Sequence, residues 1–287
     1  SFPAPDVELI TAPPEAAAWS ATQRRKARTV AFVPTMGALH EGHIALVKSA
    51  RKAGNVVASS IFVNPLQFNN PSDLAHYPRQ LDQDRRMLEE AGCDLLFAPE
   101  KEGIFADFTP RTYDLAPLDQ VLEGPSRPGH FQGVVNVVER LFFYVRPNVA
   151  LFGEKDRQQL AILKHAARKE YWPVQVEGHA TIRAADGLAL SSRNQRLSPS
   201  ERALAPVLYR SLMATNALAF KASVADAQQA GLAVLATEPS VVLDYLAIAH
   251  PETLQPLTDW DGLDEAVALV AAHVGPVRLI DNITLRR

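Results

Sequence analysis

Two segments of different periodicity flank Val33-Pro34-Thr35-Met36-Gly37-Ala38-Leu39-His40-Glu41-Gly42-His43. Residues 29–33 before it are apolar and β-branched, which predicts a buried strand. After it, Ile44, Val47 and Ala50 recur at helical spacing and predict a helix with one buried face. A glycine-bearing turn from strand to helix collects backbone N–H groups and the positive end of the helix dipole at one point. The quoted stretch therefore predicts a phosphate site.

The two histidines of this stretch leave alternatives open. Three residues apart at a helix start, His40 and His43 face the same side and could donate to phosphate oxygens. They could also hold a metal with Glu41 as a base, although zinc-protease helices use i,i+4 spacing instead. Gly37 and Gly42 could equally do no more than shape a tight connection in an α/β protein.

The composition excludes several classes of protein. With 287 residues, 47% of them hydrophobic and 21% charged, we expect a soluble globular protein, long enough for two domains. A net charge of −3 provides no basic field for nucleic acid or anionic lipid. Without an apolar run of membrane-spanning length or a signal-like N-terminus at residues 1–6, a cytoplasmic protein is expected. The single cysteine, Cys93, is expected to be a buried structural thiol.

Strands and helices alternate along residues 1–178. Besides the first strand and its helix, the pattern predicts strands at 55–63, 94–98, 149–152 and 174–177, and helices at 15–27, 79–91, 132–145 and 157–169. This order predicts a Rossmann-like parallel sheet flanked by helices, an α/β domain. In such sheets ligands bind at the carboxyl ends of the strands, where the quoted stretch and the turn at 64–68 both lie.

A smaller α+β domain is predicted over residues 179–287. Its expected helices span 198–220 and 224–237, and its expected strands span 180–183, 241–249 and 266–278.

Several polar residues stand near the predicted strand ends. Lys155 follows Gly153 at the end of one strand, where an ammonium would meet a nucleotide phosphate. Residues 191–193, Ser-Ser-Arg, offer two hydroxyls and a guanidinium for outer phosphates, or else form a polar loop. Gln67 and Gln159 can orient a hydroxyl and a carboxylate without titrating, although Gln159 could lie on the surface.

Three further residues have a weaker case. Asp84 stands among charged residues of the 79–91 helix and by itself predicts a solvated face. His130 and Arg127, in a loop rich in proline and glycine, could catch a small carboxylate or be exposed.

Thr35 to His43 resembles the His-x-Gly-His signature of the adenylyl-transferring superfamily that includes the class I aminoacyl-tRNA synthetases. Within it, residues 34–43 are similar to the form found in the pantoate–β-alanine ligase (pantothenate synthetase) family. Segments 60–68, 77–79, 129–133, 152–156 and 186–194 resemble further motifs of that family in the same order. Residues 201–287 match less distinctly, Leu66 replaces a more usual methionine, and Arg157 stands where the family usually carries an aromatic residue.

The resemblance implies a two-step ligase. The carboxylate of pantoate attacks the α-phosphorus of ATP and expels pyrophosphate, and the amine of β-alanine then attacks the pantoyl adenylate and releases AMP. It also implies Mg²⁺ and a homodimer. The charge and hydropathy above predict no nucleic-acid or membrane partner, and the position of Ser191–Arg193 near the start of the second domain suggests the hypothesis that this domain closes over the ATP site. Two rivals remain: a related nucleotidyltransferase acting on a phosphorylated small molecule, and a nucleotide-binding regulatory module without turnover.

The resemblance also assigns roles to residues. The catalytic residues would be His40, His43, Lys155 and Arg193. ATP would contact Pro34, Thr35, Met36, Gly37, His40, His43, Gly153, Lys155, Asp156, Ile182, Leu190, Ser191, Ser192 and Arg193. Pantoate would contact Gln67 and Gln159, β-alanine would contact Gln67, His130 and Arg127, and Asp84 would help to hold Mg²⁺.

Overall fold

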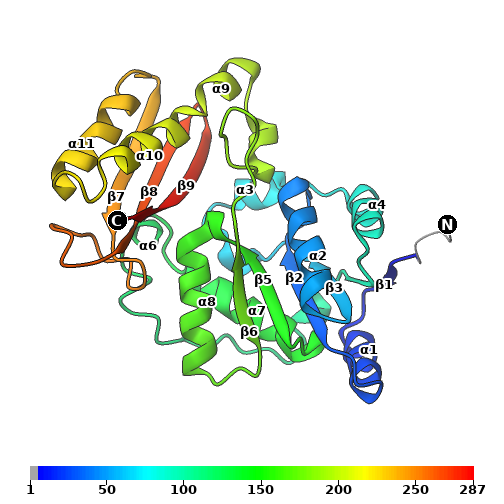
Figure 1. Cartoon of the computed structure of the whole chain (residues 1–287). Coiled ribbons are helices and arrows are strands. Elements are labelled where there is room, and N and C mark those ends of the chain that lie inside the picture. Colours follow the sequence, from blue (N-terminus) through cyan, green and yellow to red (C-terminus); the bar gives the residue numbers. More distant parts are fainter. Residues whose placement is uncertain (1–5) are drawn as a thin grey trace.

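The computed structural model describes residues 6–287, and in this range the strands form two separate sheets (Figure 1). The larger sheet has six strands in the order β1-β4-β3-β2-β5-β6, and every neighbouring pair is parallel. Its strands are β1 (Glu8–Ile10), β2 (Val30–Thr35), β3 (Val56–Ile61), β4 (Leu95–Phe97), β5 (Val149–Gly153) and β6 (Gln175–His179). The predicted parallel sheet is confirmed. The sequence did not indicate β1, because three residues are too few to show a period.

Helices cover both faces of the larger sheet because alternate strand residues point to opposite sides. Phe32 of β2 packs in one cluster with side chains of α1 (Pro13–Arg25), α7 (His130–Val145) and α8 (Arg157–Lys169). Its neighbours Ala31 and Val33 pack with α2 (Glu41–Ala53) and α4 (Leu81–Ala91). Shorter helices lie in the connections: α3 (Pro71–His76), α5 (Lys101–Ile104) and α6 (Glu123–Ser126).

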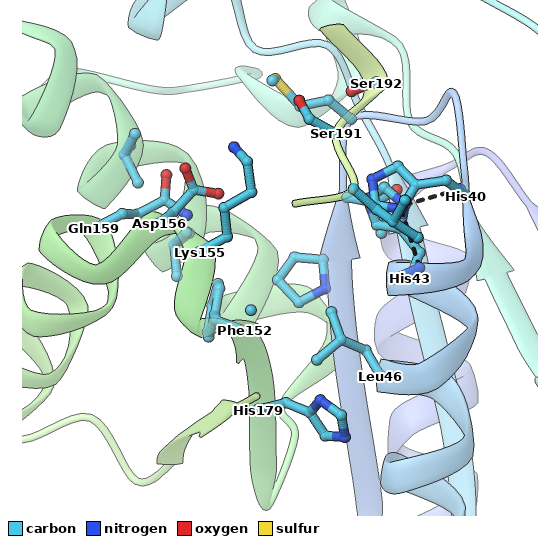
Figure 2. A pocket seen from close by; sticks show the side chains of 18 of the residues that line it. His40, His43, Leu46, Phe152, Lys155, Asp156, Gln159, His179, Ser191 and Ser192 are labelled. Atoms are coloured by element: carbon cyan, nitrogen blue, oxygen red, sulfur yellow. Dashed lines mark hydrogen bonds between the residues drawn. The ribbon is translucent and has the colours of Figure 1, made fainter. Parts of the chain in front are cut away.

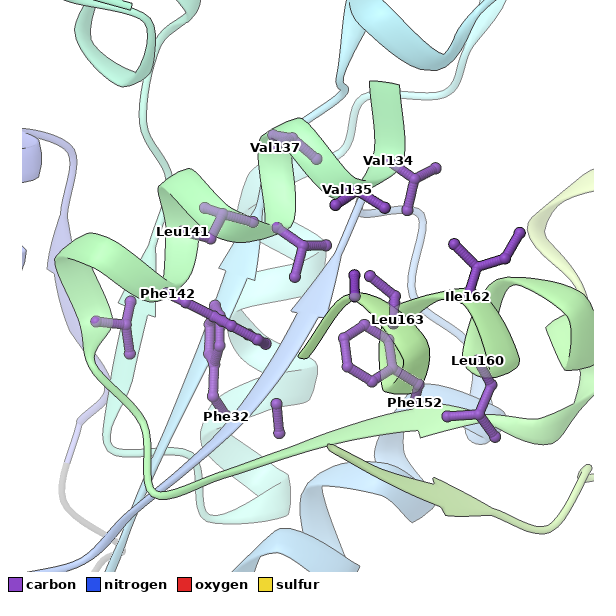
Figure 3. Close-up of a cluster of buried hydrophobic side chains, with 14 of the residues drawn as sticks. Phe32, Val134, Val135, Val137, Leu141, Phe142, Phe152, Leu160, Ile162 and Leu163 are labelled. Carbon is purple, nitrogen blue, oxygen red and sulfur yellow. The ribbon is translucent and has the colours of Figure 1, made fainter. Parts of the chain in front are cut away.

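The largest core lies between α7, α8 and the sheet (Figure 3). Phe32 and Phe142 meet edge to face with ring centroids 6.1 Å apart, a favourable aromatic geometry. The same core buries Val134 and Val138 of α7 and Phe152 of β5. Cys93 is buried beside the opposite face, as expected, and burial raises the pKa of its thiol to about 12.

The smaller sheet is antiparallel, in the order β7-β8-β9. Its elements are α9 (Pro199–Leu204), α10 (Val207–Leu218), α11 (Val224–Leu235), β7 (Val241–Ala249), β8 (Glu265–Val274) and β9 (Val277–Arg286). Ala268 and Val270 of β8 pack against α10 and α11. Val267 and Leu269, on the other face of the same strand, join the core of the larger sheet. The central strand β8 is therefore buried on both faces, whereas Val242 and Leu243 of the edge strand β7 are exposed.

Three sequence-based expectations in this part are wrong. Residues 180–183 form no strand, and Arg183 makes only an isolated bridge to Ala189. The predicted helix 198–220 is two helices, divided before Val207 at Pro206, whose ring removes an N–H donor. The predicted strand 266–278 is a hairpin, because Gly275 turns the chain with a φ of +58°.

Two further expectations concern the limits of the chain. Residues 1–5 open the predicted first domain and contributed to the expectation of a chain without a signal peptide, and they lie outside the described residues. The boundary at 178/179 stays a prediction, although β6 ends at His179. Within residues 6–287, no helix has the length and apolar character needed to cross a membrane.

Candidate active site

A cavity of about 240 Å³ opens at the carboxyl ends of β2, β5 and β6 (Figure 2). Most of the residues that were predicted to contact a ligand line it: Pro34, Thr35, Met36, His40, His43, Gln67, Gly153, Lys155, Asp156, Gln159, Ile182, Leu190, Ser191 and Ser192. They come from four separate parts of the chain. Parallel strands that end at one edge of the sheet therefore bring together residues that are up to about 160 positions apart in the sequence.

His40 and His43 cap the first turn of α2 reciprocally. The Nδ1 atom of His40 accepts a hydrogen bond from the backbone N–H of Gly42 at 3.0 Å. The Nδ1 atom of His43 accepts from the backbone N–H of His40 at 3.1 Å. Because an accepting nitrogen carries no hydrogen, each neutral imidazole holds its N–H at Nε2. The cap therefore leaves both rings with a donor for a ligand.

Both imidazoles are neutral at pH 7. Burial, with a smaller contribution from the charge of Lys155, lowers the pKa of His40 to about 4. Burial, then the neighbouring His40 and Lys155, lowers the pKa of His43 to about 3. The pair can thus donate hydrogen bonds without carrying charge.

Gly42 makes room for this arrangement. A Cβ atom at this position would lie 2.7 Å from Cε1 and 2.9 Å from Nδ1 of His40. A side chain here would therefore displace the imidazole. Gly42 is therefore needed for the position of the His40 ring, beyond its effect on the shape of the turn.

Asp84 supports the same turn from behind. Its carboxylate is buried and accepts from the backbone N–H groups of Ala38 and Leu39, each at 2.9 Å. Gln80 donates to it at 3.1 Å. The expected solvated face is wrong for this residue. Asp84 does not line the cavity, and its oxygens already accept three hydrogen bonds, which argues against the role in holding Mg²⁺.

Lys155, Asp156 and Gln159 form the opposite wall (Figure 2). They follow β5 on a 3₁₀ turn, η2 (Glu154–Asp156), and on the first turn of α8. Asn282 of β9 donates to the carbonyl oxygens of Glu154 and Lys155 at 2.9 and 3.0 Å. The small sheet thereby helps to hold this wall. Gln159 faces the cavity, so the alternative of a surface position is wrong.

Gln67 lies on another 3₁₀ turn, η1 (Pro65–Gln67), and is oriented by Asn64. The side-chain amide of Asn64 donates to Oε1 of Gln67 at 3.0 Å and to the carbonyl oxygen of Gly133 at 3.1 Å. Because Oε1 of Gln67 accepts, its Nε2 group is directed to donate. A Cβ at Gly133 would lie 2.3 Å from the carbonyl oxygen of Leu66, so glycine permits α7 to pack closely against η1.

A second chamber of about 150 Å³ adjoins the first and shares Gln67, Lys155 and the serine pair with it. Arg193, Arg127 and His130 lie here rather than in the first cavity. Nδ1 of His130 donates to the carbonyl oxygen of Gln67 at 2.8 Å. Burial, with the nearby Arg127, lowers the pKa of His130 to about 4. These three residues are therefore grouped as expected, beside the first cavity.

Glu123 and Arg278 are site residues that the sequence did not indicate. Both line the second chamber and pair directly, with Nη2 of Arg278 donating to Oε2 of Glu123 at 2.7 Å. Tyr245 donates to the same carboxylate at 2.7 Å. Burial alone would raise the pKa of Glu123, but Arg278, Tyr245 and Arg127 outweigh it and lower that pKa. The pair therefore joins α6, which precedes α7, to β9 of the small sheet.

Three further residues near the site differ in how far the sequence indicated them. Tyr77, in the 77–79 motif, shares a hydrogen bond of 3.3 Å with Ser192. Gly37, a predicted ATP contact, lies at the turn with a φ of +80° but does not line either chamber. Arg157 donates to Thr284 of β9 at 3.2 Å, so this unusual cation links the two sheets. Within residues 6–287, no three His, Cys, Asp or Glu side chains gather as a metal-binding cluster.

Comparisons with known proteins agree on one family. A family model described as pantoate-beta-alanine ligase matches residues 8–284. A pantothenate synthetase from Thermus thermophilus is 52% identical over 256 residues, which are 88% of this chain and 92% of that protein. One from Pseudomonas fluorescens is 48% identical over 273 residues, 92% of this chain and 93% of that protein.

Solved structures match the whole fold. The crystal structure of the Thermus thermophilus pantothenate synthetase has a TM-score of 0.91 at 48% identity, covering 96% of this chain and 99% of that one. The pantoate-beta-alanine ligase of Francisella tularensis, complexed with beta-gamma ATP and beta-alanine, has a TM-score of 0.80 at 33% identity. The match covers 96% of this chain and 97% of that one.

Proposed function

The chain belongs to the pantoate–β-alanine ligase family, and on that premise we propose that its pocket condenses pantoate with β-alanine, using ATP. The observation that carries the proposal is the convergence of neutral donors, one ammonium and two glutamines on a single cavity. A ligase of this kind requires a nucleotide and a hydroxy acid to lie side by side, and the two walls of the cavity suit these two partners.

In the first step, a carboxylate oxygen of pantoate forms a bond to the α-phosphorus of ATP, and the bond to pyrophosphate breaks. The Nε2–H groups of His40 and His43 donate to phosphate oxygens as negative charge redistributes, and Lys155 neutralises part of that charge. Ser191, Ser192 and Arg193 hold the leaving pyrophosphate. These roles need positioning and electrostatics only, with no covalent intermediate on the protein.

In the second step, the amine of β-alanine attacks the acyl carbon of the pantoyl adenylate, and AMP leaves. Gln67 and Gln159 hold the pantoate hydroxyl and carboxylate, with the Gln67 amide oriented by Asn64. His130 and Arg127 in the adjoining chamber bind the β-alanine carboxylate, and Gln67 lies between the two chambers. Excluding water protects the mixed anhydride from hydrolysis.

Mg²⁺ enters this proposal as part of the substrate, bound to ATP. A magnesium ion bridging phosphates needs one or two protein carboxylates at most. Asp156 is the carboxylate that lines both chambers, so it replaces Asp84 as the candidate to meet the ion or its water.

Domain closure and dimerisation belong to the same proposal. Ser191 to Arg193 lie near the start of the predicted small domain, and closure of that domain would seal the nucleotide. Crystals with and without ATP that share one domain orientation would contradict this. A homodimer would cover Phe143 of α7, whose side chain is 57% exposed. The free thiol of Cys93 suits the reducing cytoplasm.

The test is pantoate-dependent exchange of labelled pyrophosphate into ATP, with Mg²⁺ and without β-alanine. We expect exchange only when pantoate is present, because the adenylate must form before pyrophosphate can return. A folded protein that binds ATP but shows no exchange would refute the proposed reaction. Exchange with a phosphorylated acceptor instead would favour a nucleotidyltransferase.

A further inference from the structure

His179 lies at one end of the cavity and has no role in the proposed reaction. It is the last residue of β6 and lines the same cavity as His40, Lys155 and Ser191. Figure 2 shows its ring near Leu46, at the end opposite Ser191 and Ser192. The two ends of the cavity are therefore lined by different kinds of side chain.

The end at His179 suits an uncharged planar group. Leu46 and Phe152, at 8% and 7% exposure, are buried apolar walls there. The donors and the ammonium, from His40, Lys155 and the serine pair, lie towards the other end (Figure 2). A nucleoside triphosphate has one polyanionic end and one heteroaromatic end. If the phosphates take the polar end, the base lies at the end that His179 lines together with Ala180, Thr181 and Ile182.

The tautomer of His179 decides what its ring offers. Its Nδ1 atom lies 3.0 Å from the carbonyl oxygen of Ala180. A carbonyl oxygen can only accept, so Nδ1 must hold the hydrogen and donate. The neutral imidazole then has a lone pair at Nε2, which is the atom left to meet a ligand. This is the reverse of His40 and His43, whose Nε2 atoms donate.

From this we propose that His179 is a base-specificity residue, whose Nε2 accepts a hydrogen bond from the exocyclic amine of a 6-aminopurine and disfavours a 6-oxopurine. An amine presents hydrogens to the lone pair, whereas a carbonyl presents a second lone pair. A mismatched polar pair inside a partly desolvated site costs affinity because neither group is satisfied. The inference rests on the proposed use of ATP.

The experiment measures equilibrium binding of ATP and of inosine triphosphate by calorimetry, with Mg²⁺ and without pantoate. These nucleotides differ at the 6-position of the purine. We expect the wild-type protein to bind ATP at least about tenfold more tightly, as one lost hydrogen bond predicts. His179→Val should bring the two dissociation constants within about threefold. His179→Gln, whose amide can donate or accept, should bind both nucleotides with similar affinity.

The matched control is His273→Val, at an exposed position of β8 in the small sheet. It should keep the wild-type ratio of the two dissociation constants. An unchanged ratio in His179→Val, or no preference in the wild-type protein, would overturn the inference. Because binding needs no turnover, the test is separate from the exchange assay. Base preference without exchange would refute only the reaction, and exchange with an unchanged ratio would refute only the role of His179.

Discussion

Replacing Gly42 by alanine should lower the catalytic activity strongly and change the stability of the fold only slightly. The new Cβ would lie 2.7 Å from Cε1 of His40, and ordinary van der Waals contact begins near 3.4 Å, so the imidazole must move by about 0.7 Å or more. A displacement of this size at a positioning group costs about 10²-fold in rate, or roughly 2.7 kcal/mol of transition-state stabilisation. We therefore expect kcat/KM to fall about 10²-fold.

The free energy of unfolding should change much less than the activity. Losing the hydrogen bond from Gly42 to His40 costs about 0.5–2 kcal/mol, as for other N-caps. Alanine has a higher helix propensity than glycine, and this difference stabilises the folded state by up to about 1 kcal/mol. The free energy of unfolding in urea should therefore stay within roughly 1 kcal/mol of the wild type.

A double-mutant cycle with His40→Ala provides the control. Once the imidazole is absent, the next atom near the added Cβ is Cβ of Leu190 at 4.0 Å, which is no clash. Gly42→Ala should then cost nothing further in pyrophosphate exchange. If Gly42→Ala lowers the exchange rate equally in the wild-type and the His40→Ala backgrounds, the added methyl group acts on something other than the His40 ring. Full activity of Gly42→Ala alone would refute the steric argument.

Three further predictions test other parts of the structure. Because the pKa of His43 falls from 6.5 unfolded to about 3 folded, the unfolded state binds the proton first. Through His43 alone, the free energy of unfolding should therefore drop by up to about 1.4 kcal/mol per pH unit below pH 6.5. His43→Gln should reduce the slope in urea titrations by that amount, while His40 and His130, whose pKa values are also lowered, maintain the rest of the slope. Glu123→Gln weakens a buried ion pair and should cost roughly 3 kcal/mol in urea unfolding, whereas a loss below about 1 kcal/mol would contradict a joining role. Phe143→Ser should convert the proposed dimer to a monomer in light scattering, and an unchanged mass would place the interface elsewhere.

Local patterns were enough to predict the larger sheet, apart from its edge strand β1, and most of the cavity. The turn at 34–43 and Lys155 each follow a strand directly, and parallel strands end at one edge. Gln67 and Ser191 were candidates as polar residues near predicted strand ends, and the family resemblance assigned their roles. In each case the feature is encoded within about ten consecutive residues.

Long-range pairing explains what was missed. Asp84 is a charged residue on a helix, and nothing nearby indicates that it will meet the backbone of Ala38, 46 positions earlier. Glu123 and Arg278 are 155 positions apart, and each alone resembles an ordinary surface charge. The breaks at Pro206 and Gly275 were local signals that longer apolar patterns concealed. Such distant partners can be identified only from the folded structure, in which the two sheets are packed together.

The two-sided burial of β8 has a consequence for how the molecule melts. Val267 and Leu269 belong to the core under the larger sheet, whereas Ala268 and Val270 belong to the core of the smaller one. Neither core can lose its packing while the other stays intact. The chain should therefore unfold in a single calorimetric transition, and a bound nucleotide should shift that whole transition upward. Product release should then proceed without unfolding of the small sheet, because Asn282 of that sheet holds the carbonyl groups of Glu154 and Lys155 at the cavity wall.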